Sequence, residues 1–283
     1  MIELSAATFC LQWATGGLAF LWVTTRRREV GIGYGWLMRG SFGAIAALGV
    51  FLGFRYDDAL GRELLGIGVV VATSGALVVS VIRRRAGVAG ERERVAVKSA
   101  RISEMTGIER EIDGPRDDVP EFPPALDLIA PIIGLVGLFV AADVGGGPYA
   151  LSLLRLIAGA AFLGAVTDAM LLGHWYLVQP GLRREPLLEL VRWTAATWPV
   201  EVVAMLLPTG MLSVLDGSID DGYGGILGWF WLACVVTTIV LVYVTRAALR
   251  ERYYSAVMAA TGLLYLAILT AFGTDLVARA VLS

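Results

Sequence analysis

The chain has 283 residues, of which 57% are hydrophobic and 17% are charged, and its formal net charge is −2. Its mean hydropathy is +0.71. Soluble domains carry about 25% charged residues, so this composition excludes an ordinary soluble domain and predicts a polytopic membrane protein. The sequence has no phosphate-binding loop, dinucleotide fingerprint, nucleophile elbow or metalloprotease helix. We therefore expect no catalytic activity from this chain alone and no binding of nucleic acid.

Eight apolar stretches are each long enough for the roughly 20 residues that a helix needs to cross the hydrocarbon core. They lie at residues 4–24, 36–54, 64–82, 126–143, 151–177, 187–212, 225–246 and 254–276. The pattern predicts an all-α transmembrane bundle of about eight spans. The first stretch has no Lys or Arg before it and is longer than the core of a signal peptide, so we expect it to stay in the mature protein.

Basic residues are distributed very unevenly between the connecting segments. If the N-terminus faces outward, 19 of the 23 Lys and Arg residues fall on the inner side, and only Arg55, Arg62, Arg155 and Arg279 fall on the outer side. Short basic flanks resist translocation and so set the orientation of the spans. Both termini are therefore expected on the outer side, which is the periplasmic side if the protein lies in a bacterial inner membrane.

The longest polar segment, 84–124, divides the chain into a three-span bundle at 1–83 and a five-span bundle at 125–283. Residues 83–101 contain seven basic and two acidic residues, whereas 102–121 contain two basic and seven acidic ones. The two blocks could fold back on each other. One interpretation is a solvated cytoplasmic loop whose basic part contacts anionic headgroups, and the other is a docking surface for a cytoplasmic partner.

Small residues recur within the spans. Gly49 and Gly53 form a GxxxG pair in the second span, and Gly159 and Gly164 lie in the fifth. Small residues let helices approach closely in lipid, where packing drives helix association. This pattern predicts close helix contacts at these positions, within the bundle or between copies of the chain.

Two acidic residues lie inside apolar spans, in the hairpin 164–210. Glu201 is placed near the bilayer midplane by the helical rise, with Pro199 and Pro208 nearby to kink its helix. Asp168 is expected at a similar depth on the preceding span. Ionisable groups at such depths are costly and often functional. The pair predicts a shared proton or a bound cation if the two side chains face each other, and interhelical hydrogen bonds if they do not.

The single histidine, His174, is followed by Trp175 and Tyr176 near the inner end of the fifth span. An aromatic belt at the membrane interface is one interpretation. The other is a site in which the imidazole binds a quinone carbonyl or relays protons. One histidine excludes bis-histidine haem within one chain, and the two isolated cysteines, Cys10 and Cys234, predict neither a disulfide nor a metal centre.

The outer loop after the sixth span contains a weak candidate for a calcium site. Asp216, Ser218 and Asp220 place oxygen ligands at alternate positions, as calcium loops do, but Leu227 stands where the bidentate Glu belongs. The alternative is an acidic turn without metal.

Two functions remain open on the sequence alone. The first is a membrane subunit or accessory protein of a larger, respiratory-type assembly, whose acid and histidine hairpin lines a quinone or proton-accessible pocket. The second is a proton- or cation-coupled secondary transporter that uses Glu201 and Asp168. Both place the chain as a multi-pass protein of the cell membrane, in contact with the lipid bilayer and with other membrane subunits or copies of itself. A bound quinone or lipid is the expected small molecule.

Overall fold

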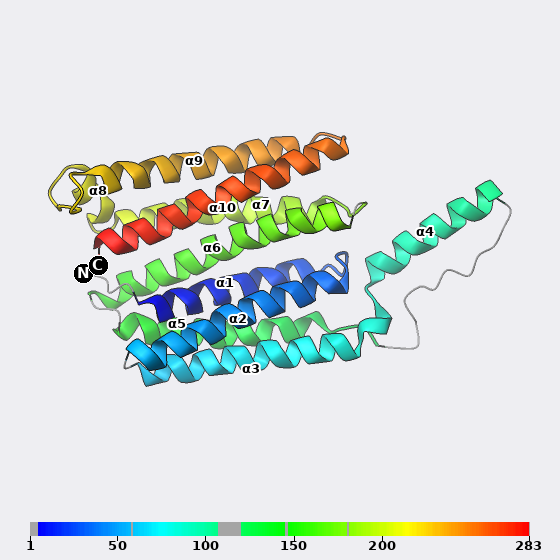
Figure 1. Ribbon diagram of the computed structural model, residues 1–283, viewed down its shortest axis with the longest axis horizontal. Helices are drawn as coiled ribbons and strands as arrows, with labels where there is room; N and C mark the ends of the chain where they lie inside the picture. Colours follow the sequence, from blue (N-terminus) through cyan, green and yellow to red (C-terminus); the bar gives the residue numbers. More distant parts are fainter. Residues whose placement is uncertain (1–4, 58, 107–119, 145–146, 180, 283) are drawn as a thin grey trace.

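The computed structural model describes residues 5–57, 59–106, 120–144, 147–179 and 181–282 (Figure 1). Within these residues the chain forms helices and no strand. The long helices are α1 (Ala6–Thr25), α2 (Ile32–Tyr56), α3 (Leu60–Ile82), α5 (Ile129–Val144), α6 (Tyr149–Val178), α7 (Glu185–Leu206), α9 (Ile226–Ala248) and α10 (Tyr254–Leu282). The shorter elements are α4 (Ala89–Thr106), α8 (Gly210–Leu215) and the 3-10 turns η1 (Arg84–Ala86) and η2 (Pro124–Leu128).

The predicted all-α membrane bundle is confirmed. Seven of the described helices are long and apolar enough to cross a membrane: α1, α2, α3, α5 with its leading turn, α6, α9 and α10. The remaining predicted stretch, the sixth in chain order, forms α7, a helix of 22 residues that carries Glu185, Glu189, Arg192 and Glu201. It packs along α6 and α9 within the bundle (Figure 1). Of its ionisable residues only Glu201 is buried among the apolar helices, whereas Glu185 and Arg192 are exposed.

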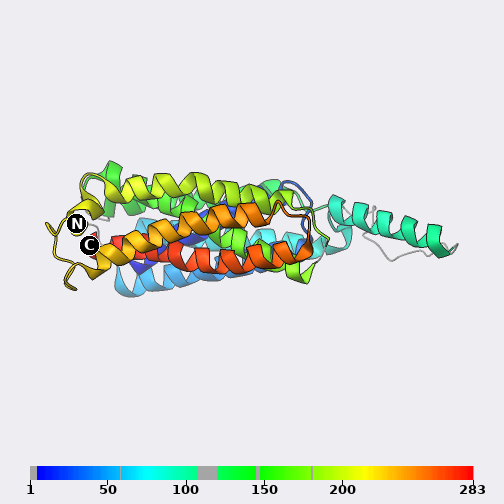
Figure 2. The ribbon, with the colours of Figure 1, turned by 90° about the horizontal axis from the view of Figure 1, so that it is seen from above.

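The helices pack side by side in a bundle with distinct ends (Figures 1 and 2). Both termini lie at one end, named here the terminal end, and α4 projects from the opposite end, named the α4 end. The termini therefore share one side of the bundle, as the charge pattern predicted. The division into a three-span and a five-span bundle stays a prediction, and contacts join the two parts, because α1 packs along α6 and α3 packs along α5.

Small residues bring α1 and α6 into backbone contact. A Cβ atom on Gly16 would lie 1.8 Å from the carbonyl oxygen of Ala160, and one on Gly164 would lie 2.3 Å from the carbonyl carbon of Gly16. The predicted contact at Gly49 is also present, where a Cβ atom would lie 2.9 Å from the Cβ of Cys10. Packing of this kind holds membrane helices together without water exclusion.

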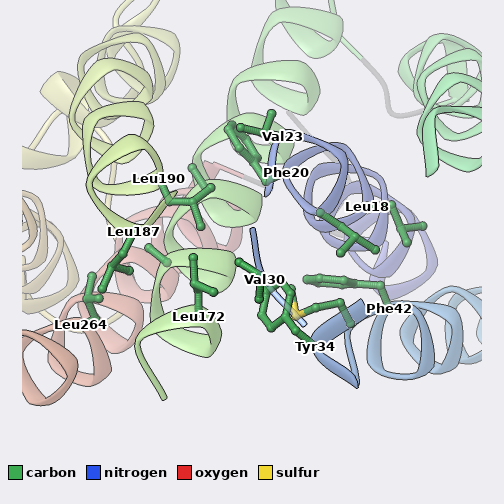
Figure 3. Close-up of a cluster of buried hydrophobic side chains, with 14 of the residues drawn as sticks. Leu18, Phe20, Val23, Val30, Tyr34, Phe42, Leu172, Leu187, Leu190 and Leu264 are labelled. Atoms are coloured by element: carbon green, nitrogen blue, oxygen red, sulfur yellow. The ribbon is translucent and has the colours of Figure 1, made fainter. Parts of the chain in front are cut away.

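Large apolar side chains fill the space beside this contact (Figure 3). Leu18, Tyr34 and Phe42 from α1 and α2 belong to the same buried cluster as Leu172 of α6 and Leu187 of α7. Other large apolar side chains are exposed on the outside of the bundle, including Phe51, Val71 and Leu269 at 64%, 65% and 70% exposure. Apolar surface on this scale fits contact with lipid tails.

The sixth predicted span ends earlier than its apolar pattern suggests. The prediction continued it to residue 212, but α7 ends at Leu206, just before Pro208. The residue before a proline is forced out of the helical region, so the chain turns there and the short α8 begins at Gly210. Pro199, by contrast, lies within α7. Glu201 is therefore about five residues, or roughly 8 Å, from the end of its helix.

Residues beside α4 tie the charged segment to the bundle. Glu121 pairs with Arg92 of α4 and, at 3.2 Å, with Arg28 from the α1–α2 turn, and its carbonyl oxygen accepts a hydrogen bond from Arg83. The acidic part of the segment thus folds back on basic residues at Glu121. The rest of that acidic part, 107–119, lies outside the described residues, and the proposed cytoplasmic partner stays a prediction.

Candidate functional site

Glu201 is fully buried, at 0% exposure, on the side of α7 that faces the interior of the bundle. Within the described residues no donor reaches either of its carboxyl oxygens, and the carboxylate of Asp275 is close enough to share a proton with it. Its electrostatic neighbours are Asp275 and Arg279 of α10 and Arg155 of α6. The acid thus lies in a polar cluster of residues from α1, α6, α7 and α10, named here the buried cluster.

The Asp275–Arg279 pair anchors the buried cluster on α10. The two residues are one turn apart, and Arg279 Nε lies 2.9 Å from both carboxylate oxygens of Asp275. Arg279 Nη2 also donates to the carbonyl oxygen of Arg155, at 3.0 Å. A bidentate pair of this type is among the stronger hydrogen-bonded ion pairs. It uses most of the donors of Arg279 on partners other than Glu201.

Arg155 satisfies the end of α7. Its Nε donates to the carbonyl oxygen of Ala204 at 3.0 Å, and its Nη2 donates to that of Leu207 at 2.6 Å. The last carbonyl groups of a helix lack intrahelical partners, and here Pro208 prevents the helix from continuing. The Arg155 side chain replaces the missing donors and lies 5% exposed within the bundle.

Gly159 of α6 lacks a side chain at the point where Gln12, Asp275 and Arg279 come close to the helix backbone. A Cβ atom at this position would lie 2.3 Å from Gln12 Nε2, 2.8 Å from Arg279 Nη2 and 2.8 Å from Asp275 Oδ1. Gln12 of α1 is fully buried, and its amide nitrogen and oxygen have no hydrogen-bond partner in the described part of the chain. The amide is therefore a polar group beside the cluster that is free to bond a water, a proton carrier or an ion.

The charges of the buried cluster are nearly balanced in either protonation state of Glu201. With Glu201 ionised, two carboxylates face two guanidinium groups and the net charge is zero, and with Glu201 protonated it is +1. Burial and the neighbouring carboxylate of Asp275 favour the protonated acid. The two guanidinium groups favour the carboxylate. Groups of both signs thus lie beside Glu201.

Asp168 lies outside the buried cluster that surrounds Glu201. It is fully buried on α6, and its carboxyl oxygens have no hydrogen-bond partner among the described residues. The hydroxyl of Tyr34 on α2 donates to its backbone oxygen at 3.5 Å. The electrostatic neighbours of Glu201 lie on α6 and α10 and do not include Asp168. The sequence left open whether the two carboxyls face each other. In the structure they have different electrostatic neighbours, Tyr34 of α2 beside Asp168 and residues of α6 and α10 beside Glu201.

The residues of the His-Trp-Tyr run face three different neighbours. His174 is exposed, and its Nδ1 lies 3.1 Å from the hydroxyl of Tyr265 on α10. The Trp175 ring packs 6.1 Å from that of Tyr34, and the Tyr176 hydroxyl donates to the carbonyl oxygen of Arg183. The three side chains thus point to different neighbours. A quinone bound at these residues stays a prediction.

In the acidic turn that was the calcium candidate, the carboxylates accept hydrogen bonds from backbone amides. Asp216 accepts from the amide of Ser218 at 2.8 Å, and Asp220 accepts from that of Gly222 at 2.9 Å. Asp221 accepts from the amides of Tyr223, Gly225 and Leu227 at the start of α9. Among the described residues no three His, Cys, Asp or Glu side chains are grouped to hold a metal ion, and the carboxylates of this turn bind backbone amides.

Most partners of Glu201 were missed from the sequence. Arg155 and Arg279 were counted only as basic residues of the outer side, and Asp275 was not singled out, but all three are buried. The spacing of Asp275 and Arg279 was a signal that could have found them, because oppositely charged residues four apart share one face of a helix. Gln12 carried no comparable signal.

Comparison with known protein families, curated proteins and solved structures gave no match. The chain is a multi-pass α-helical membrane protein, and it carries buried ionisable groups on α6, α7 and α10.

Proposed function

We propose that this protein is a proton-coupled secondary transporter in which Glu201 is the group that binds and releases the proton. The observation that carries the proposal is the Glu201 carboxyl itself, which is buried, has no hydrogen-bond donor among the described residues and lies beside the Asp275–Arg279 pair. Intramembrane acids of this kind mark proton and ion pathways in transporters.

The neighbours of Glu201 support a reversible role. Arg279 is engaged by Asp275, and Arg155 by the end of α7, so neither locks Glu201 in a fixed ion pair. Both remain close enough to stabilise its carboxylate when the proton leaves. A change in its charge would act directly on α6 and α10, which pack against each other.

Asp168 is proposed as a second proton-binding group, deeper in the bundle and nearer the α4 end. It lies about 13 Å along α6 from Gly159, by the helical rise, and its carboxyl also lacks a partner in the described part of the chain. With the α4 end facing the cytoplasm, as the basic residues there suggest, Glu201 lies toward the outside and Asp168 toward the inside. We place the protein in the cell membrane, with a bacterial inner membrane as the proposed setting.

The predicted role as a subunit of a respiratory-type assembly with a quinone pocket depended on His174, Trp175 and Tyr176. Because these residues face different neighbours, the geometry favours the transporter. Other membrane subunits as partners stay a prediction.

The test uses the purified full chain in liposomes that contain a pH-sensitive dye. Proton movement is recorded under an imposed membrane potential and after addition of each solute from a panel of amino acids, sugars, organic acids, nucleosides and metal cations. We expect proton movement with the unchanged chain and its loss in Glu201→Gln. Glu185→Gln is the matched control, because Glu185 is an exposed acid on the same helix. Proton movement that is absent in all arms, or equal in Glu201→Gln, would overturn the proposal.

A further inference from the structure

An apolar groove runs along the side of the bundle between α5 and α7. It has a volume of about 430 Å³, within the range of small-molecule sites in proteins. Its floor is formed by α1 and α6, where Gly16 meets Ala160. The lining residues are Thr15, Gly16, Ala19, Phe20, Trp22, Val23, Leu128, Pro131, Ile132, Leu135, Leu138, Ile157, Ala160, Ala161 and Trp193.

The chemistry of the walls selects an aliphatic chain. None of the residues that line the groove is charged, and among them Thr15 alone carries a hydroxyl. That hydroxyl donates to the carbonyl oxygen of Leu11 at 2.6 Å, so it is not offered to the groove. A ligand with a polar head inside the groove would lose hydrogen bonds there. Since the groove opens sideways from a membrane bundle, lipid tails are the molecules that reach it.

The groove continues toward basic residues at the α4 end. Trp22 lines the groove, and the guanidinium of Arg26 lies 5.1 Å from its ring centre. Arg26 and Arg27 both bind the carboxylate of Glu189, each at 2.5 Å. These three groups together carry a net charge of +1, and the carboxylates of Glu29 and Glu185 also act on Arg27. Both arginine side chains remain more than a third exposed, at 39% and 36%, so an anionic headgroup can reach them.

We propose that this groove binds one acyl chain of an anionic phospholipid, with the headgroup phosphate held by Arg26 and Arg27. The lipid belongs to the leaflet at the α4 end. Tryptophan at the membrane interface and basic residues beside it are the features that bind anionic lipid at such depths. The proposal does not depend on the transport function, because none of its residues belongs to the buried cluster.

The groove is tested by native mass spectrometry of the full chain released from vesicles of equal phosphatidylglycerol and phosphatidylethanolamine. The unchanged protein should retain phosphatidylglycerol preferentially. Ala161→Phe should abolish that retention because the ring fills the groove, and Ala19→Phe serves as a second filling variant. Ala47→Phe is the matched control, since Ala47 is exposed on α2 away from the groove.

The headgroup contact is tested separately with Arg27→Gln, which leaves the groove open and Arg26 paired with Glu189. Loss of one basic residue at the surface should weaken retention of phosphatidylglycerol about fivefold. Three results would overturn the proposal: equal retention of both lipids, unchanged retention in the two filling variants, or a bound quinone or second polypeptide in place of the phospholipid.

Discussion

The contact between α1 and α6 gives the most direct prediction about the fold. In Gly16→Ala the new methyl group would lie 1.8 Å from the carbonyl oxygen of Ala160. Ordinary contact begins near 3.4 Å, so the two helices would have to separate by roughly 1.5 Å to relieve the clash. The obstacle is backbone, which cannot rotate away as a side chain can. Overpacking of this type costs about 1–3 kcal/mol, and we expect a loss at the upper end of that range.

The matched control is Gly75→Ala on α3, where a Cβ atom meets nothing within 4 Å. Alanine is a better helix former than glycine, by about 0.5–1 kcal/mol, so this variant should be unchanged or slightly more stable. The assay is thermal and denaturant-induced unfolding of both variants in the same detergent, followed by far-ultraviolet circular dichroism. Equal stability of Gly16→Ala and the unchanged protein would refute the close contact of α1 and α6.

Three further predictions concern the ends of the bundle. Asp127→Asn should destabilise the protein by about 3–5 kcal/mol in the same unfolding assay, because it leaves the guanidinium of Arg39 buried without its carboxylate, which lies 2.8 Å away. Asp221→Ala should loosen the start of α9, seen as faster amide hydrogen exchange at residues 225–229, and added calcium should not change that exchange. The backbone amide of Gly225, with those of Tyr223 and Leu227, lowers the pKa of Asp221 below its ordinary value of 3.8. The stabilisation by Asp221 should therefore be complete above that value and be lost as the pH falls through the lower pKa of the folded state. Protection factors, taken against the intrinsic exchange rate at each pH, that stay unchanged at acid pH would contradict the contact.

The helical bundle could be predicted well because its signal is local. A run of about 20 apolar residues can satisfy its backbone groups in lipid only as a helix or within a barrel, and the basic residues place the ends of the runs. The predicted end of the sixth span at residue 212 was wrong because the apolar composition continues past Pro208, whereas the helix ends at Leu206. Apolarity sets where a chain can be buried, and proline sets where the helix must stop.

The candidate site was predicted only in part because its geometry depends on which helix faces meet. Glu201 and Asp168 stood out as acids in apolar spans, and the structure buries both. Their separation follows from the position of α10, which packs on α6 and brings Asp275 and Arg279 to Glu201. No spacing within the hairpin 164–210 contains information about a helix that begins at Tyr254.

The central claim is that Glu201 binds and releases a proton within the buried cluster, and infrared difference spectroscopy tests it most directly. The reconstituted protein is stepped in pH while the carbonyl stretch of protonated carboxyl groups is recorded, with Glu201→Gln and Glu185→Gln measured alongside. The account predicts a band that gains and loses intensity reversibly, is absent from Glu201→Gln and persists in Glu185→Gln. A spectrum of Glu201→Gln that matches the unchanged protein at every pH at which both are folded would contradict the account.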